Sequence, residues 1–192
     1  MFAAILDTCV LWPSLQRDFL LSMAVEGLYR PLWSEAILAE LHEHEIEKLV
    51  DRGMDHSLAT LRASHLIDQM RTHFDDALVT GWEPLEGTYG LNDPDDEHVV
   101  AAAVVGGAGV IVTDNLRDIA PDRVPSQVQV VTAAQFAADT VDVDPLRAVA
   151  ALRQISGRSA NPSRSVNDLV ALLASRYGMD EAAEILQAHL VE

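Results

Sequence analysis

The sequence predicts an α/β protein in which a parallel sheet is flanked by helices and followed by an all-helical C-terminal extension. Apolar segments of strand composition alternate with segments of helical periodicity from residue 2 to about residue 140, an order that is typical of parallel sheets. The strand segments are apolar throughout, as a sheet buried on both faces requires. After residue 144 only helical segments follow. We therefore expect a domain over residues 1–144 and a helical extension over residues 145–192.

The first half of the chain divides into segments with recognisable ends. In chain order we expect a strand at 2–6, a helix at 14–26, a strand at 29–33, helices at 34–52 and 55–74, and a short strand with a turn within 76–85. Pro13 and Gly27 bound the first helix. Ser34 and Asp55 are suitable N-caps for the two long helices, and Gly53 closes the first of these two.

The second half follows the same logic until the strands stop. We expect a helix at 93–107, strands at 109–113 and 128–131, and helices at 132–138, 146–155, 166–176 and 181–190. Asp93 as N-cap and Pro94 in the first turn open the helix at 93. Ser165 and Asp168 resemble a capping box in which Asp replaces the usual Glu, and Gly178 ends that helix.

Composition excludes several classes of protein. The longest apolar run, 99–105, is far too short to span a membrane, and the first residues lack the basic leader and apolar core of a signal peptide. We therefore expect a soluble, cytoplasmic protein. Cys9 is the only cysteine, so neither an intrachain disulfide nor a thiolate metal cage can form. Cys9 also lacks a paired histidine motif, so we do not expect a catalytic thiol.

The charge distribution is uneven. A formal net charge of −17 argues against a generic nucleic-acid binder, because phosphate contacts need Lys or Arg. One segment of the extension is nevertheless basic, since five arginines and a single acid, Asp168, lie between residues 147 and 176. These arginines are Arg147, Arg153, Arg158, Arg164 and Arg176. They are either ordinary helix-surface residues or a patch that contacts RNA or another anionic partner.

Four carboxylates from remote parts of the chain are placed to meet at one edge of the predicted sheet. Asp7 and Asp114 directly follow strands, and the carboxyl ends of parallel strands form the ligand-binding edge of such sheets. Asp96 lies in the first turn of a helix that opens onto the same edge, and Glu40 lies on the helix after the second strand. Each residue also has a purely structural explanation: a helix-dipole partner for Asp96, loop acids for Asp7 and Asp114, and a solvated helix position for Glu40.

The convergence of these carboxylates indicates that they bind a cation. Two carboxylates about 4 Å apart repel by roughly 4 kcal/mol at an effective dielectric of 20, so a folded chain gathers several of them only around a cation or a shared proton. Oxygen ligands favour Mg²⁺ or Mn²⁺ over zinc or copper. The sequence "LHEHE" (41–45) is not a zinc motif, because His42 and His44 are two residues apart on a helix and point in different directions.

The stretches "AILDTCVLWPSLQRDFLLSMAVEGLYRPLWSEAILAEL" and "DPDDEHVVAAAVVGGAGVIVTDNLRDI" resemble PIN domains. The resemblance is closest to the VapC-type toxins of bacterial toxin–antitoxin pairs, in the subgroup with a helical C-terminal extension, and it covers essentially the whole chain. It implies a PIN-like, Rossmann-like fold and a metal-dependent endoribonuclease. It further implies a cognate antitoxin as partner and a homodimer.

The resemblance also implies roles for particular residues. Its catalytic positions correspond to Asp7, Glu40, Asp96 and Asp114. The implied ligands of Mg²⁺ or Mn²⁺ are Asp7, Asp96, Asp114 and Asp118. Thr8 and Asn115 are implied to orient these ligands without binding the metal themselves. Glu40 is implied to hold or deprotonate the attacking water.

This sequence departs from the family pattern at three points. Glu97 stands where relatives often carry a basic residue, so it either weakens RNA approach or adds a ligand. Ile119 replaces a common Phe. The acid after the strand is ambiguous by register, because the fourth position of the family falls on Asn115 when aligned from Thr113, which leaves the roles of Asp114 and Asp118 open.

Two other functions are compatible with an acid directly after the first strand. An aspartate-based phosphotransferase normally needs a second acid where Cys9 stands. A non-catalytic PIN-fold protein that binds an antitoxin or another partner is the remaining alternative. We expect His98 to be a partly buried helix residue rather than a substrate contact. Trp12, Trp33 and Trp82 could stack on bases, although packing is the favoured expectation for all three.

Overall fold

The computed structural model describes residues 2–158 and 163–190. Its strands form one five-stranded parallel sheet of order β3-β2-β1-β4-β5. The strands are β1 (Ala3–Leu6), β2 (Arg30–Ser34), β3 (Leu78–Val79), β4 (Val110–Val112) and β5 (Gln129–Val131). The predicted α/β class and helix-flanked parallel sheet are therefore confirmed.

The centre of the sheet is the pairing of β1 with β4. Ala4, Ile5 and Leu6 lie opposite Val110, Ile111 and Val112 in parallel register. Because the two strands are in register, the residues that follow them, Asp7 and Thr113, emerge at the same edge of the sheet. The backbone N–H of Asp7 still donates to the carbonyl of Val112 at 3.1 Å, which fixes this register up to the first site residue.

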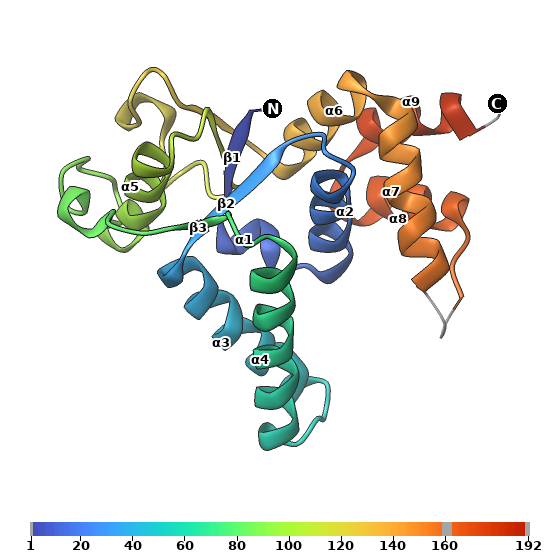
Figure 1. Ribbon diagram of the computed structural model, residues 1–192, viewed down its shortest axis with the longest axis horizontal. Coiled ribbons are helices and arrows are strands. Elements are labelled where there is room, and N and C mark those ends of the chain that lie inside the picture. The colour runs from blue at the N-terminus through green and yellow to red at the C-terminus, as the bar shows by residue number, and fades with distance from the viewer. Residues whose placement is uncertain (1, 159–162, 191–192) are drawn as a thin grey trace. The chain divides into compact units, whose positions relative to one another are not determined.

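The sheet-bearing half contains α1 (Thr8–Leu11), α3 (Glu35–Asp51), α4 (His56–His73) and α5 (Glu97–Gly106), with short 3₁₀ turns η1 (Glu83–Leu85), η2 (Pro94–Asp96) and η3 (Pro121–Arg123). Helix α5 begins at Glu97 rather than at its predicted start, since Asp93 and Pro94 open the 3₁₀ turn η2. Ser34 and Asp55 accept hydrogen bonds from the first turns of α3 and α4. These two helices lie side by side as an antiparallel pair (Figure 1). The single turn α1 was not predicted from the sequence.

The remaining helices are α2 (Ser14–Val25), α6 (Ala133–Val143), α7 (Pro145–Arg158), α8 (Val166–Tyr177) and α9 (Asp180–Leu190). Helix α6 runs five residues beyond its predicted end at residue 138, because Val141 continues its buried stripe. The capping box of Ser165 and Asp168 is present at the start of α8. Within the described residues, no helix combines the length and apolar composition needed to cross a membrane.

The chain packs as two compact units. One consists of residues 3–12 and 31–130, and the other of residues 13–30 with Phe2 and the described part of 131–192. The first unit buries Ile5, Leu6, Ile111 and the apolar side of α5. The second unit packs α2 against α7 and α6 against α9. The predicted domain boundary at residue 144 stays a prediction, although α2 groups with the C-terminal helices.

Candidate active site

A pocket of about 430 Å³ opens at the edge of the sheet where β1 and β4 end. It is lined by side chains from α1, α3, the start of α5 and the segment after β4. They are Asp7, Thr8, Cys9, Trp12, Glu40, His44, Asp96 and Asn115. All eight belong to the sheet-bearing unit, so the unit builds the pocket by itself. The structure therefore brings together Asp7, Glu40 and Asp96, three of the four acids expected to converge, and adds Asn115 in place of Asp114.

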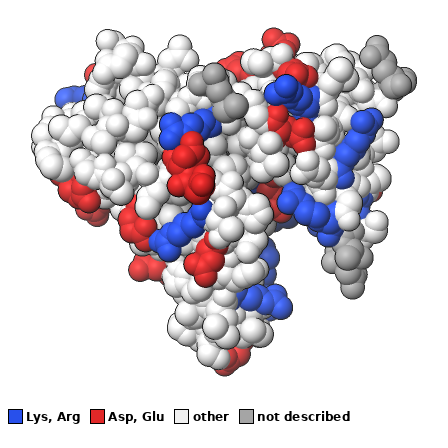
Figure 2. Space-filling view, in the orientation of Figure 1, with Lys and Arg blue, Asp and Glu red and all other residues white. Residues whose placement is uncertain are grey.

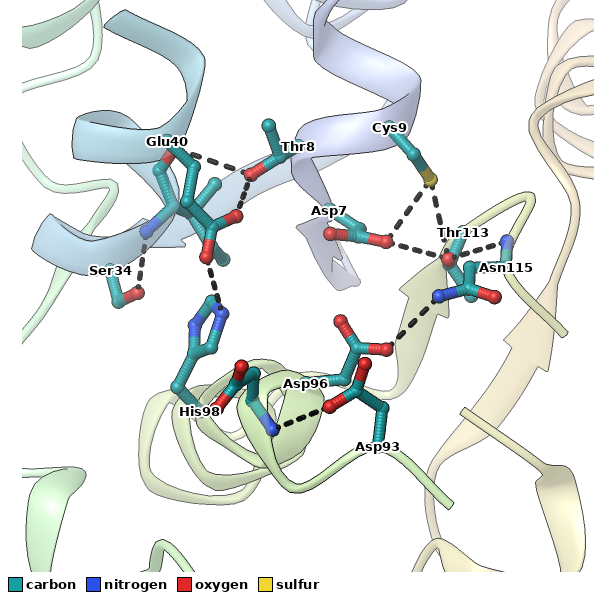
Figure 3. Close-up of polar contacts among 12 residues, drawn as sticks. Asp7, Thr8, Cys9, Ser34, Glu40, Asp93, Asp96, His98, Thr113 and Asn115 are labelled. Carbon is teal, nitrogen blue, oxygen red and sulfur yellow. Dashed lines mark hydrogen bonds and ion pairs between the residues drawn. The ribbon is translucent and has the colours of Figure 1, made fainter. Parts of the chain in front are cut away.

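Asp7 is held firmly in this pocket. The side chain is 6% exposed, and its Oδ2 accepts a hydrogen bond from Thr113 Oγ1 at 2.6 Å and one from Cys9 Sγ at 3.1 Å. Both groups donate to the same oxygen, so Oδ1 accepts neither of these two hydrogen bonds. In Figure 3 the carboxyl groups of Asp7 and Asp96 point toward one another across the pocket.

Asp96 lies at the junction of η2 and α5 and does not use its side chain to cap the helix. Its Oδ2 accepts a hydrogen bond from Asn115 Nδ2 at 3.0 Å. Burial raises the pKa of Asp96 to about 6, and the negative charges of Asp7, Asp93 and Asp118 add to this effect. A cation close to this carboxyl group would lower its pKa again.

Glu40 stands on the opposite side of the pocket, on α3. Thr8 Oγ1 donates to its Oε2 at 2.6 Å, and His98 Nε2 lies 2.9 Å from its Oε1. Burial raises the pKa of Glu40, but the hydrogen bonds from His98 and Thr8 outweigh it, so the pKa lies below its ordinary value. Glu40 is therefore an ionised carboxylate, fixed from both sides.

His98 is the partner that orients Glu40. The residue is 4% exposed and comes from the first turn of α5. Burial lowers the pKa of His98, but its hydrogen bond to Glu40 and the nearby carboxylates outweigh this, so the pKa of the imidazole is raised. The sequence suggested a partly buried helix residue, and the structure adds that it acts through Glu40.

Comparison with known families agrees with this geometry. The sequence model of the PIN domain matches residues 3–117, which is more than half of the chain and contains every residue of the pocket. The chain belongs to the PIN domain family. PIN domains are generally nucleases and typically use divalent metal ions. Searches of curated proteins and of solved structures give no match.

The donor set of this PIN domain fits a hard divalent cation. Asp7 and Asp96 offer carboxylate oxygens across one pocket, and Mg²⁺ is commonly held by one or two carboxylates with water completing its shell. Burial and the nearby carboxylates raise the pKa of Asp96, and a cation bound beside it would oppose this shift. Within the described residues, no group of three or more His, Cys, Asp or Glu side chains is arranged to hold an ion. The fit therefore rests on the two carboxylates.

Two predicted ligands lie outside the pocket lining. Asp114 is exposed, and its backbone N–H donates to Cys9 Sγ at 3.2 Å. Asp118 is half-buried and contributes negative charge that raises the pKa of Asp96. Asn115 is the residue after β4 that reaches the pocket. The roles of Asp114 and Asp118 as ligands remain predictions.

Glu97 does not line the pocket and instead binds the backbone of the preceding loop. It is 2% exposed, and its two oxygens accept backbone hydrogen bonds from Tyr89 (3.1 Å), Gly90 (2.7 Å) and Leu91 (3.2 Å). Burial raises the pKa of Glu97, but the hydrogen bonds from these N–H groups lower it by more, so the pKa lies below its ordinary value. Glu97 thus anchors the loop before η2 and does not add a ligand.

Cys9 is a hydrogen-bonding residue in this site. Burial and the charge of Asp7 raise the pKa of the thiol to about 12. A thiol with that pKa is protonated at neutral pH and is a poor nucleophile. It donates to Asp7 instead, which agrees with the expectation that Cys9 is not a catalytic thiol.

Four residues of the site were not assigned to it from the sequence. Thr113 is fully buried and holds Asp7; His98 holds Glu40; His44 and Trp12 line the pocket. His44 follows Glu40 by four residues on α3, so helical spacing could have placed it on the same face. Trp12 was one of three tryptophans that could stack on bases, but its place in the pocket could not be predicted, because the turn α1 that presents it was not predicted.

The arginines of the C-terminal helices make several contacts within their own unit. Arg147 lies 3.3 Å from Asp144 and donates to the carbonyl of Glu26. Arg158 donates to Ser22 Oγ at 3.0 Å, and Arg176 stacks on Tyr177. In Figure 2 the basic and acidic side chains are interspersed over the face of the molecule that is visible. RNA or partner contact by these arginines, including Arg153 and Arg164, stays a prediction.

Proposed function

We propose that this PIN domain is a metal-dependent endoribonuclease that hydrolyses RNA phosphodiester bonds. The observation that carries the proposal is the convergence of Asp7 and Asp96, 89 residues apart in the chain, on one pocket where the pKa of Asp96 is raised to about 6. Two like charges held together, one buried at Asp7 and one half-buried at Asp96, are costly unless a cation or a shared proton balances them. The family supports the nuclease class, and the oxygen donors support Mg²⁺ or Mn²⁺.

The residues around this pair have distinct tasks in the proposal. Asp7 and Asp96 would hold the ion, and Thr113 and Asn115 would orient their carboxylates. A bound divalent ion lowers the pKa of water and offsets charge on phosphoryl oxygens. Glu40, kept ionised by Thr8 and His98, would hold or deprotonate the attacking water. Outer hydrogen bonds of this kind commonly tune metal sites.

RNA cleavage with and without metal tests the proposal. Wild-type protein is incubated with RNA and Mn²⁺ or Mg²⁺, and then with a chelator. We expect cleavage that the chelator abolishes and that Asp7→Asn lowers by at least about 100-fold, because the ion loses a charged ligand. Asp122→Asn, a highly exposed acid outside the pocket, is the matched control. Wild-type protein that cleaves no RNA at any metal concentration would favour a non-catalytic interaction protein.

We further propose, on the resemblance to VapC-type proteins, that the nuclease is the toxin of a type II toxin–antitoxin module. Such a toxin acts with a cognate antitoxin and forms a homodimer. Induced expression in a bacterial host should stop growth, and Asp7→Asn should relieve the arrest. If wild type and Asp7→Asn arrest growth equally, cleavage is not the cause and the toxin proposal is wrong.

A further inference from the structure

Trp12 differs from the other two tryptophans in its surroundings. Trp33 is fully buried and Trp82 is 8% exposed, whereas Trp12 is 42% exposed. Trp12 also lines the pocket that contains Asp7 and Asp96. Trp12 follows Asp7 by five residues. The residues between them form the single turn α1, in which the chain advances by only about 1.5 Å per residue. A large aromatic ring is therefore exposed to solvent beside the carboxylates.

The position of Trp12 is fixed by α3. Lys48 Nζ donates to the carbonyl oxygen of Trp12 at 3.2 Å and lies 5.9 Å from the centre of its ring. Lys48 is itself paired with Glu45, and both side chains are largely buried. A backbone hydrogen bond and a cation–π contact thus hold the ring in place, and an aromatic surface that is already ordered loses little entropy on binding.

The pocket offers little else that would bind nucleic acid. None of the described residues that line it is Lys or Arg, and Lys48 is occupied by Glu45 and Trp12. Lys or Arg side chains therefore cannot supply affinity for RNA next to the carboxylates. Stacking of a base on an aromatic ring does not depend on charge and tolerates any base. Trp12 is the side chain of the pocket that can make this contact.

We propose that Trp12 is the stacking platform for an unpaired nucleobase next to the phosphodiester bond that is cleaved. A base inside a duplex is stacked on its neighbours and cannot lie on the indole. The inference rests on the proposed ribonuclease function and adds to it a binding residue and the place where it holds a base. The alternative is that a protein surface packs on the indole of Trp12, in which case RNA binding would not depend on this residue.

The test uses Trp12→Leu, Trp12→Phe and the control Leu61→Ala, which shortens an exposed apolar residue of α4. Substrates are a single-stranded RNA with a mapped cleavage site, the same RNA with one abasic position at a time, and its duplex. For wild type, an abasic residue at one position should lower kcat/KM by roughly 5- to 150-fold, the range of one stacking contact. Trp12→Leu should show a similar loss on intact RNA and no further loss at that abasic position.

Trp12→Phe should recover part of the activity, Leu61→Ala should behave as wild type, and the duplex should be cleaved poorly by wild type. The inference is overturned if Trp12→Leu keeps wild-type kcat/KM and wild-type sensitivity to every abasic position. That result would leave RNA cleavage itself intact, so it is distinguishable from failure of the proposed function, in which wild type cleaves no RNA.

Fluorescence tests the contact without cleavage. With a chelator present, the single-stranded RNA should quench the emission of wild type, because Trp12 is the exposed indole, and Trp12→Phe should remove most of the change. Quenching that persists in Trp12→Phe would place the base elsewhere and refute the stacking role.

Discussion

The acids between residues 93 and 97 perform three different tasks, although they are adjacent in the chain. Asp93 accepts a hydrogen bond from the backbone of Asp95 at the start of η2. Glu97 binds the backbone of the preceding loop. Asp96 points into the pocket and is held by Asn115. A run of similar side chains therefore separates into a cap, a loop anchor and a site residue, according to the direction in which each side chain leaves the turn.

Glu97→Gln should destabilise the protein by about 1–3 kcal/mol, because an amide nitrogen would face buried backbone donors. Since the pKa of Glu97 is lowered on folding, its stabilisation is present above the unfolded pKa of 4.5 and is lost as the pH falls through the lower folded pKa. Thermal unfolding from pH 7 to pH 3 measures this. The difference between wild type and variant should shrink in acid, whereas Glu86→Gln, an exposed neighbour, should differ little at any pH.

Thr113→Val should weaken the proposed metal site without unfolding the protein. Valine fills the same buried space but cannot donate to Asp7, and loss of such supporting hydrogen bonds typically costs about 10–100-fold in metal affinity or activity. The Mn²⁺ concentration that gives half-maximal cleavage is the measurement. Thr113→Ser retains the hydroxyl and should stay near wild type. Equal metal dependence in Val and Ser variants would show that the bond to Asp7 is dispensable.

At the scale of elements, close packing at the end of α5 sets its distance from the sheet. A Cβ atom built on Gly106 would lie 2.7 Å from Val79 Cγ2 and 3.0 Å from Leu32 Cδ1. Both neighbours belong to strands of the sheet, so the helix can approach this closely only with glycine. Because α5 also carries His98 next to Asp96, its position relative to the sheet bears on the site.

Gly106→Ala should therefore destabilise the protein by about 1–3 kcal/mol through overpacking. Gly109→Ala is the matched control, since nothing lies within 4 Å of its added Cβ and its backbone is not in the left-handed region. Chemical denaturation of both variants measures the effect. Equal stability of the two variants would mean that Val79 and Leu32 adjust at no cost.

At the scale of the whole molecule, packing does not follow the order of the chain. Helix α2, from near the N-terminus, packs against α7 of the C-terminal segment, and it buries Phe19, Leu20 and Met23 completely. Deleting residues 145–192 would remove α7 and uncover the surface of α2 that packs against it. Truncation is therefore a poor test of whether the C-terminal arginines contact RNA or an antitoxin.

A chain ending at residue 144 should fail to fold stably in its α2 region. Exposing three large apolar side chains costs roughly 5–9 kcal/mol at about 1.5–3 kcal/mol each, which is comparable to the whole stability of a typical domain. Limited proteolysis should cut within residues 14–25 of the truncated chain. Arg153→Ala in the full chain should keep those residues protected. Protection of α2 in the truncated chain would disprove this dependence.

The sequence by itself determined the alternation of strands and helices, most caps, and the acids that follow β1 and precede α5. These features are local, because they depend on periodicity and on the residue types that end each element. Only the tertiary structure decided which acids meet. Asp114 and Asn115 are neighbours in the chain, yet Asn115 reaches the pocket and Asp114 is exposed. The role of Thr113 and the partners of His98 and Trp12 were likewise invisible in the sequence, since each contact spans 36 to 106 residues of the chain, and such contacts leave no spacing pattern in a single sequence.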